Sequence, residues 1–151
     1  MRNIPLVQQE GALRSYFPGS SIVRSRDTEL TWIHTVTPSP VSDYYTIRLH
    51  YHRCEGIRMY VLEPEKLKLA KGKLLLPHVY STPRQRLCLY DPEGNEWHPG
   101  MYYVKTIIPW AVEWLYHYEI WAGTGEWHGG GKDHETAAER RARFDPRILV
   151  M

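Results

Sequence analysis

Hydrophobic and polar positions follow two different periods in the first part of the chain. Leu6, Leu13 and Phe17 are spaced for one side of a helix. This spacing predicts a helix from about Leu6 to Tyr16, ended by the following Pro-Gly-Ser-Ser run. Four strand-like runs separated by turn signals come next. These runs are Ile22–Arg26, Leu30–Val36, Tyr44–His52 and Ile57–Leu62. Their short gaps favour an antiparallel meander, because parallel neighbours need long crossovers.

The clearest helix signal lies in the second half of the chain. Four aromatic residues recur there at helical spacing: Trp110, Trp114, Tyr118 and Trp121. Because a neighbouring face is apolar too, we expect a well-buried helix from Pro109 to about Ala122. Pro109 suits a first helical position, and Gly123-Thr124-Gly125 supplies a stop. Asp133 is a candidate cap for a final charged helix that runs to about Arg143.

Residues 65 to 105, between the meander and this helix, lack a strong period. Irregular stretches of this length in compact domains are usually functional or disordered. This one is rich in Leu, Tyr and Pro, which favours an ordered segment. We therefore expect functional residues within it.

Composition limits the class of protein. The chain has 151 residues, of which 42% are hydrophobic, and we expect one globular domain over residues 1–151. The net charge of +2 gives no reason to expect a nucleic acid or a membrane surface as partner. No apolar run has the length of a signal peptide or a membrane span, which favours a cytoplasmic protein. Cys54 and Cys88 are too few for a disulfide framework, so we expect both to be reduced.

Two patterns suggest metal or phosphate binding, and both are weak. His50, His52 and Cys54 alternate along a strand and can share a face. Three zinc ligands at this spacing, without an obvious fourth, are unusual, so an ordinary strand face is the better interpretation. The three glycines before Lys132 lack the earlier glycine and the following Ser or Thr of a phosphate-binding loop. We expect no metal and no cofactor.

Cys88 is the strongest candidate for chemistry. A free cysteine is commonly a buried, inert apolar residue, so its neighbours decide the interpretation. The surrounding segments are Leu76-Pro77-His78-Val79-Tyr80, Cys88-Leu89-Tyr90 and Trp97-His98-Pro99. A thiolate at this position would be the reactive form for carrying an acyl group.

These segments resemble the ubiquitin-conjugating enzymes over roughly residues 5 to 125. That family carries His-Pro-Asn upstream of its active cysteine, and its histidine stands ten positions before the cysteine, as His78 stands before Cys88. Leu89 matches the leucine that often follows, and Trp97-His98-Pro99 matches a Trp-x-Pro. The resemblance implies an α/β (α+β) fold of the ubiquitin-conjugating (UBC-like) type. Its elements are an N-terminal helix, a four-stranded antiparallel meander, an active-site loop and C-terminal helices.

A closer resemblance is to the bacterial conjugating-enzyme-like proteins of CBASS antiphage operons. The residues that carry it are Pro77–Tyr80, Leu87–Tyr90, Thr106–Trp110 and Trp127. Those operons encode a cGAS-like nucleotidyltransferase (CD-NTase). The resemblance implies a thioester between Cys88 and the C-terminus of that partner, followed by transfer to an amine. The sequence shows no activating-enzyme domain, so either a separate activating enzyme supplies the ATP-driven step or the acyl group arrives by another route.

Supporting roles follow from the same resemblance. The family's motif histidine mainly orders the loop, so we expect an ordering role for His78 ahead of a role as general base. Tyr80 replaces the motif asparagine that helps to stabilise an oxyanion, and a phenol can also donate a hydrogen bond. Trp97 is expected to support the loop. Asp91, Glu93 and Glu96 can orient or deprotonate an incoming amine, or be solvated turn residues.

Two other functions stay open. The first is a binding module of the same fold that recognises a protein tail without catalysis. Replacement of the motif asparagine favours this module, and the spacing of Cys88 opposes it. The second is a cysteine hydrolase that removes a conjugate, which needs an imidazole base for water. His78 and His98 are available, but neither lies in a known protease motif.

Overall fold

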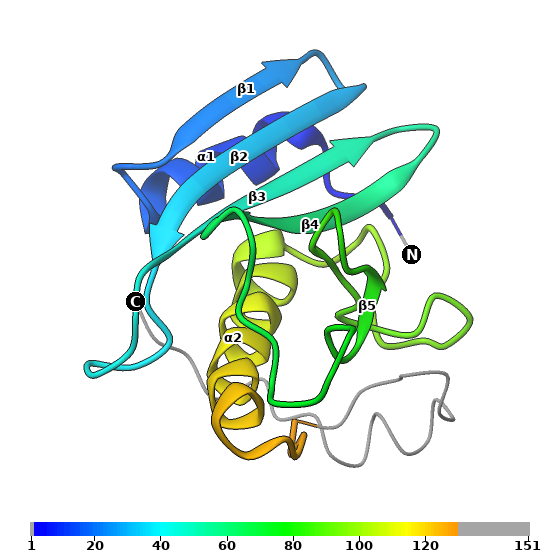
Figure 1. The fold of residues 1–151 in the computed structure, drawn as a ribbon. Coiled ribbons are helices and arrows are strands. Elements are labelled where there is room, and N and C mark those ends of the chain that lie inside the picture. The colour runs from blue at the N-terminus through cyan, green and yellow to red at the C-terminus, as the bar shows by residue number, and fades with distance from the viewer. Residues whose placement is uncertain (1, 130–151) are drawn as a thin grey trace.

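The computed structural model describes residues 2–129 of the chain (Figure 1). Its helices are α1 (Leu6–Tyr16), the 3-10 helix η1 (Tyr103–Lys105) and α2 (Ile107–Thr124). Its strands are β1 (Ser21–Ser25), β2 (Glu29–Val36), β3 (Tyr45–His52), β4 (Gly56–Glu63), β5 (Val79–Ser81) and β6 (Arg86–Leu87). The segment 130–132 and the helix predicted from Asp133 to Arg143 lie outside the described residues.

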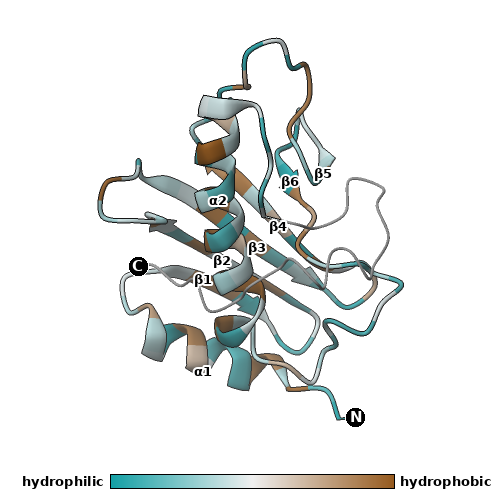
Figure 2. Cartoon of the chain, turned by 90° about the horizontal axis from the view of Figure 1, so that it is seen from below, coloured by the Kyte–Doolittle hydropathy of each residue, from teal (hydrophilic) through white to brown (hydrophobic). Residues whose placement is uncertain are grey.

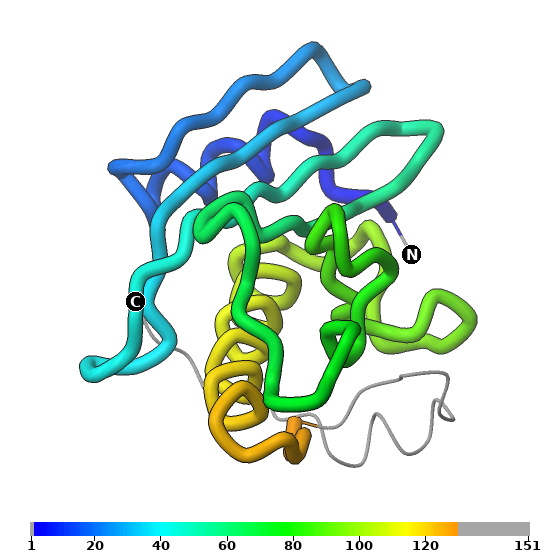
Figure 3. The backbone as a smooth tube through the Cα atoms, in the orientation of Figure 1, coloured from blue at the N-terminus to red at the C-terminus, as the bar shows by residue number. Residues whose placement is uncertain are grey.

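The strands form one antiparallel sheet in the order β1-β2-β3-β4-β6-β5. β1 to β4 make the predicted meander, and each lies within one residue of its predicted bounds at either end. β2 and β3 pair along their whole length, from Glu29 opposite His52 to Val36 opposite Tyr45. Figure 3 follows this path as a continuous tube. The mixed α+β architecture is compatible with the UBC-like fold predicted from the sequence.

Side chains of the sheet alternate between an inner and an outer face, as the period of a strand requires. The inner face carries Trp32, Ile47 and Leu49, all fully buried. Both α-helices lie on this side of the sheet (Figure 2). The ring of Phe17, just after α1, meets Trp32 edge-on at 5.3 Å. The helix signal at Leu6, Leu13 and Phe17 is thus confirmed, because all three are buried.

Helix α2 forms the centre of the domain, but it begins two residues earlier than predicted. Pro109 is its third residue and not its first. Proline fits there because the first helical N–H groups have no partner within the helix. The N–H of Trp110 makes the first bond, to the carbonyl oxygen of Thr106 at 2.9 Å. Gly125 ends the helix as predicted, at a φ of 81° that favours glycine.

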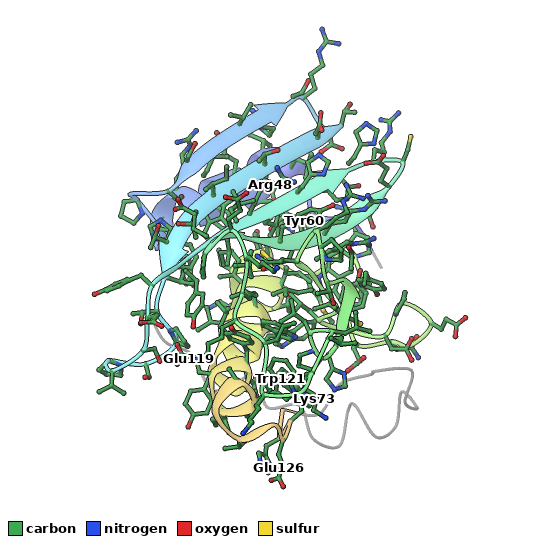
Figure 4. All side chains as sticks on the ribbon, viewed as in Figure 1. Arg48, Tyr60, Lys73, Glu119, Trp121 and Glu126 are labelled. Carbon is green, nitrogen blue, oxygen red and sulfur yellow. The ribbon has the colours of Figure 1, made fainter. Side chains whose placement is uncertain are left out.

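The buried face of α2 consists mainly of aromatic rings. Trp110, Trp114, Tyr118 and Trp121 are all buried, as predicted. The rings of Trp114 and Tyr118 stack at 5.5 Å. On another side of the helix, Glu119 accepts hydrogen bonds from the hydroxyls of Ser42 and Tyr45. Ser42 lies in the loop between β2 and β3, and Figure 4 shows Glu119 directed toward that loop. Helix α2 therefore contacts both the sheet and the loop between β2 and β3.

Residues 65 to 105 are ordered, as predicted, but they are not wholly irregular. They contain β5, β6 and η1, which are too short for a periodic signal in the sequence. β5 and β6 extend the predicted four-stranded meander to six strands. None of the helices within residues 2–129 is long and apolar enough to cross a membrane.

Candidate active site

The hairpin of β5 and β6 positions Cys88, which follows directly after β6. Arg86 pairs with Tyr60 of β4, so the hairpin is joined to the edge of the meander. The N–H of Cys88 donates to the carbonyl oxygen of His78 at 3.1 Å, across the base of the hairpin. The Cys88 side chain lies 3.7 Å from the carbonyl oxygen of Tyr90. Cys88 is only 8% exposed, so neighbouring residues cover most of its surface.

Gln85 connects this hairpin to the rest of the domain. Its side chain is buried and its backbone has a φ of 51°. The amide nitrogen donates to the carbonyl oxygens of Val61 at 3.0 Å and Pro64 at 3.1 Å. The amide oxygen accepts a hydrogen bond from the N–H of Leu67. One side chain thus holds the hairpin against β4 and the segment that follows β4.

His78 is buried and joins the segment that contains Cys88 (residues 87–90, the Cys88 loop) to α2. Its carbonyl oxygen accepts a hydrogen bond from the Trp114 indole at 3.1 Å, in addition to the one from Cys88. Its imidazole lies 5.0 Å from the ring of Trp127. The φ of His78 is 50°, a left-handed conformation that a non-glycine residue rarely adopts. Both hydrogen bonds are made by the backbone carbonyl of His78, and its imidazole contacts Trp127.

Tyr80 lies beside the thiol and is half exposed. Burial raises the pKa of the Tyr80 phenol, and the neighbouring Cys88 side chain raises it further, both by charge and by hydrogen bonding. The Arg86 guanidinium lies 4.3 Å above the Tyr80 ring, within the range of a cation–π contact. Because the pKa is raised, the phenol keeps its proton at neutral pH and can donate a hydrogen bond.

Trp97 contacts the segment after Cys88 through its ring. Its ring lies 5.4 Å from the ring of Tyr90, and Tyr90 contacts Cys88 through its backbone carbonyl. On the far side, Trp97 stacks with Tyr103 of η1 at 6.4 Å. Among the predicted site residues, the structure brings His78, Tyr80 and Cys88 together. Trp97 joins them through Tyr90.

The acidic residues after Cys88 differ in their surroundings. Asp91 is buried and accepts a hydrogen bond from the N–H of Glu93 at 2.9 Å. The side chain of Glu96 accepts one from the N–H of Asp91 at 2.9 Å. Glu93 is exposed. Asp91 is therefore not a solvated turn residue, which was one of its two predicted roles.

The remaining candidate ligands have ordinary hydrogen bonds. His50 bonds Glu29 at 2.6 Å, and the His52 ring accepts the N–H of Cys54 at 3.0 Å. The His98 ring accepts the N–H of Gly100 at 3.1 Å. In the part of the chain that the structure describes, no group of three His, Cys, Asp or Glu side chains is placed to hold a metal ion. Cys54 and Cys88 are both free thiols.

Comparison with known families decides the relationship. A family model described as Type II CBASS E2 protein matches residues 9–135. The chain belongs to the E2-CBASS family. The resemblance predicted from Cys88 and its neighbours is thereby confirmed. None of the curated proteins compared with the chain matches it.

Membership in the E2-CBASS family supports a role in CBASS defence, E2-like conjugating activity and a protein partner. Within this CBASS E2 protein, two residues that position the site were not recognised as such from the sequence. Gln85 is one, and nothing in its local sequence separates it from a polar turn residue. Trp114 is the other, because helical spacing predicted its burial but not its bond to the His78 carbonyl.

Proposed function

We propose that Cys88 forms a thioester with the C-terminus of a cGAS-like nucleotidyltransferase and passes that acyl group to an amine. The observation that supports this is the hydrogen bond from the Cys88 N–H to the His78 carbonyl in a chain of the E2-CBASS family. It places the histidine and cysteine of the motif side by side. Tyr80, at the position of the motif asparagine, lies next to both.

The acyl group is transferred in two steps. The Cys88 thiolate attacks the carbonyl carbon of an activated C-terminus, a C–S bond forms and the activating group leaves with the electron pair. An amine then attacks the thioester carbon, a C–N bond forms, and the C–S bond breaks to return the thiolate, while the amine loses one proton to solvent. The Tyr80 phenol donates to the oxyanion in the second step. A separate activating enzyme supplies the activated C-terminus.

The test is intact mass spectrometry of the full chain co-expressed with the other proteins of its operon. Wild type should carry a protein-sized adduct that a thiol reagent removes. Cys88→Ser should carry an oxygen ester that resists the thiol, and Cys88→Ala should carry none. Cys54→Ser is the matched control because Cys54 is an exposed free thiol far along the sequence, and it should keep the adduct. An adduct on the Cys88→Ala protein would exclude Cys88 as the carrier.

A second function is favoured by one observation, the small exposure of the Cys88 side chain. A protein that only binds a tail has no need for an accessible thiol. This binding module predicts that the partner co-purifies equally with wild type and with Cys88→Ala, with no covalent adduct on either. That outcome would contradict thioester carriage by Cys88 and support the binding module.

A further inference from the structure

A cavity of about 250 Å³ lies beside the Cys88 loop, between the edge of β4 and the segment after β6. Leu87 and Leu89, the neighbours of Cys88 in sequence, form part of its wall, and Tyr80 forms another part. The full lining is Glu55, Gly56, Ile57, Arg58, Met59, Tyr80, Arg86, Leu87, Leu89, Tyr90, Pro92 and Ile107. Cys88 is not itself part of the lining, but Tyr80, whose phenol interacts with the Cys88 side chain, is.

The edge of β4 is open along this cavity. β3 pairs with β4 from Gly56 onward, but within residues 2–129 β6 pairs with β4 only through Tyr60 and Arg86. The N–H of Val61 points toward the hairpin, where it bonds the Gln85 carbonyl. Since alternate residues of a strand direct their N–H groups to the same side, those of Met59 and Ile57 point into the cavity. An unpaired strand edge of this kind is a template for an extended peptide.

The two walls of the cavity differ in chemistry. Tyr60 alternates with the inner-face residues Met59 and Val61 and so lies on the outer face of the sheet. Arg86 is directly opposite Tyr60, and Arg58 is two residues from Tyr60 along β4, so both arginines lie on that outer face too. Ile57 and Met59 lie on the inner face, with the buried side chains of Leu89 and Ile107. A strand added at this edge alternates in the same way. Its successive side chains meet an apolar wall and a basic wall in turn.

The basic wall has unused hydrogen-bonding capacity. The Nε atoms of Arg58 and Arg86 are buried and have no hydrogen-bond partner, and neither side chain forms an ion pair within residues 2–129. On the same face, Arg48 lies 4.7 Å above the ring of Tyr60 (Figure 4). The one carboxylate of the lining, Glu55, sits at the turn before β4. The Arg86 guanidinium also lies over the Tyr80 ring, at 4.3 Å. Guanidinium groups that have no ion pair bind carboxylates strongly, through charge-assisted hydrogen bonds.

We propose that this cavity binds the C-terminal segment of the acyl donor as an extended strand along β4, with apolar side chains inward and acidic side chains on Arg58 and Arg86. The proposal rests on the proposed function and adds the substrate class, a tail of alternating apolar and acidic residues. The carboxyl end of the tail lies toward Met59, since β6 ends there and Cys88 is the next residue.

The test uses two fluorescein-labelled hexapeptides, one alternating valine with glutamate and the other valine with glutamine. Fluorescence anisotropy with the full chain should show binding of the glutamate peptide at least tenfold tighter than the glutamine peptide. Arg58→Gln and Arg86→Gln should each weaken the glutamate peptide by about tenfold and leave the glutamine peptide unchanged. Arg84→Gln removes the same charge from an exposed position outside the cavity and should change neither peptide by more than about twofold.

Hydrogen exchange on the wild-type chain gives a second measurement that needs no variant. The glutamate peptide should slow exchange at the amides of Ile57 and Met59, and leave the β3-bonded amide of Arg58 unchanged. Equal affinity for the two peptides, equal loss with Arg84→Gln and Arg58→Gln, or slowed exchange only outside β4 would each overturn the proposal. Cys88→Ala should keep peptide binding. If the chain binds the peptide but forms no adduct, only thioester carriage is contradicted. If it forms the adduct but does not bind the peptide, only the proposed binding of the tail in the cavity is contradicted.

Discussion

Strands β2, β3 and β4 pair along most of their length, whereas β5 and β6 pair through only two registered positions. The meander is stabilised by inner-face side chains that alternate with outer ones, so its energy is spread over many apolar contacts. The β5–β6 hairpin has few apolar anchors, such as the buried Leu87, and is joined to the domain by polar bonds from Gln85 and Trp114. A concentrated set of bonds can be released by one change or one partner. We therefore expect single substitutions in the hairpin to expose Cys88 more than single substitutions in the meander do.

The largest expected effect is a loss of stability in the meander of β1 to β4, the scaffold of the domain. Leu49 is fully buried on β3, in the middle of the sheet. Leu49→Ala should lower the free energy of unfolding by about 2–5 kcal/mol, because it removes buried methyl groups and leaves a cavity. Urea denaturation measures this change. Under conditions where the variant stays folded, alkylation of Cys88 by iodoacetamide should stay within about twofold of wild type. A much faster alkylation would show that scaffold and loop are not separable.

The next effect breaks the hairpin. Gln85→Ala leaves two backbone carbonyls and one N–H without their side-chain partner. We expect a loss of about 2–3 kcal/mol in the free energy of unfolding and alkylation of Cys88 at least tenfold faster than in wild type. Gln8→Ala is the matched control, since Gln8 is exposed on α1. If both variants alkylate at the wild-type rate, Gln85 does not hold the loop closed.

The difference between the long strands of the meander and the short strands of the hairpin also decides which elements the sequence could predict. The meander was predicted to within one residue because alternation over eight-residue strands such as β3 leaves a clear signal. β5 and β6 have three and two residues, which is too short for a period to be visible. The spacing of His78 and Cys88 identified the family, but the bonds of Gln85 join positions up to 24 apart. Such contacts depend on the folded chain and have no local pattern.

A smaller effect concerns the chemistry of the loop. Tyr80→Phe should slow transfer of the acyl group to an amine by about tenfold, roughly 1.4 kcal/mol, through loss of one oxyanion donor. Tyr80→Asn restores the motif residue of conjugating enzymes and should recover most of the rate. Single-turnover transfer from isolated thioester to lysine measures both. Tyr44→Phe, in an exposed loop position, should match wild type.

The pH dependence of this transfer follows from the raised pKa of Tyr80. A phenol with an ordinary pKa begins to lose its proton near pH 10, and a raised pKa moves that loss to higher pH. Between pH 7 and 10 the donor therefore stays protonated, and the ratio of wild-type to Tyr80→Phe rates should be constant. A ratio that falls toward one across this range would mean that the phenol ionises, in contradiction to its surroundings.

The smallest effect lies on the scaffold surface, where Glu10 of α1 bonds Arg14 at 2.7 Å and Arg24 of β1 at 2.6 Å. Hydrogen bonds from Arg24 and then Arg14 lower the pKa of Glu10 from its ordinary 4.5. A lowered pKa means that the stabilisation is fully present above pH 4.5 and is lost as the pH falls through the folded-state value. Glu10→Gln should thus cost only about 0.5–1 kcal/mol at pH 7, because both arginines are partly exposed and screened by solvent. Denaturation curves of variant and wild type should converge once the pH lies below the lowered pKa of Glu10. A difference that persists there would mean that the substitution acts on stability through something other than the charge of Glu10, and would contradict its ion pairs with Arg14 and Arg24 as the cause.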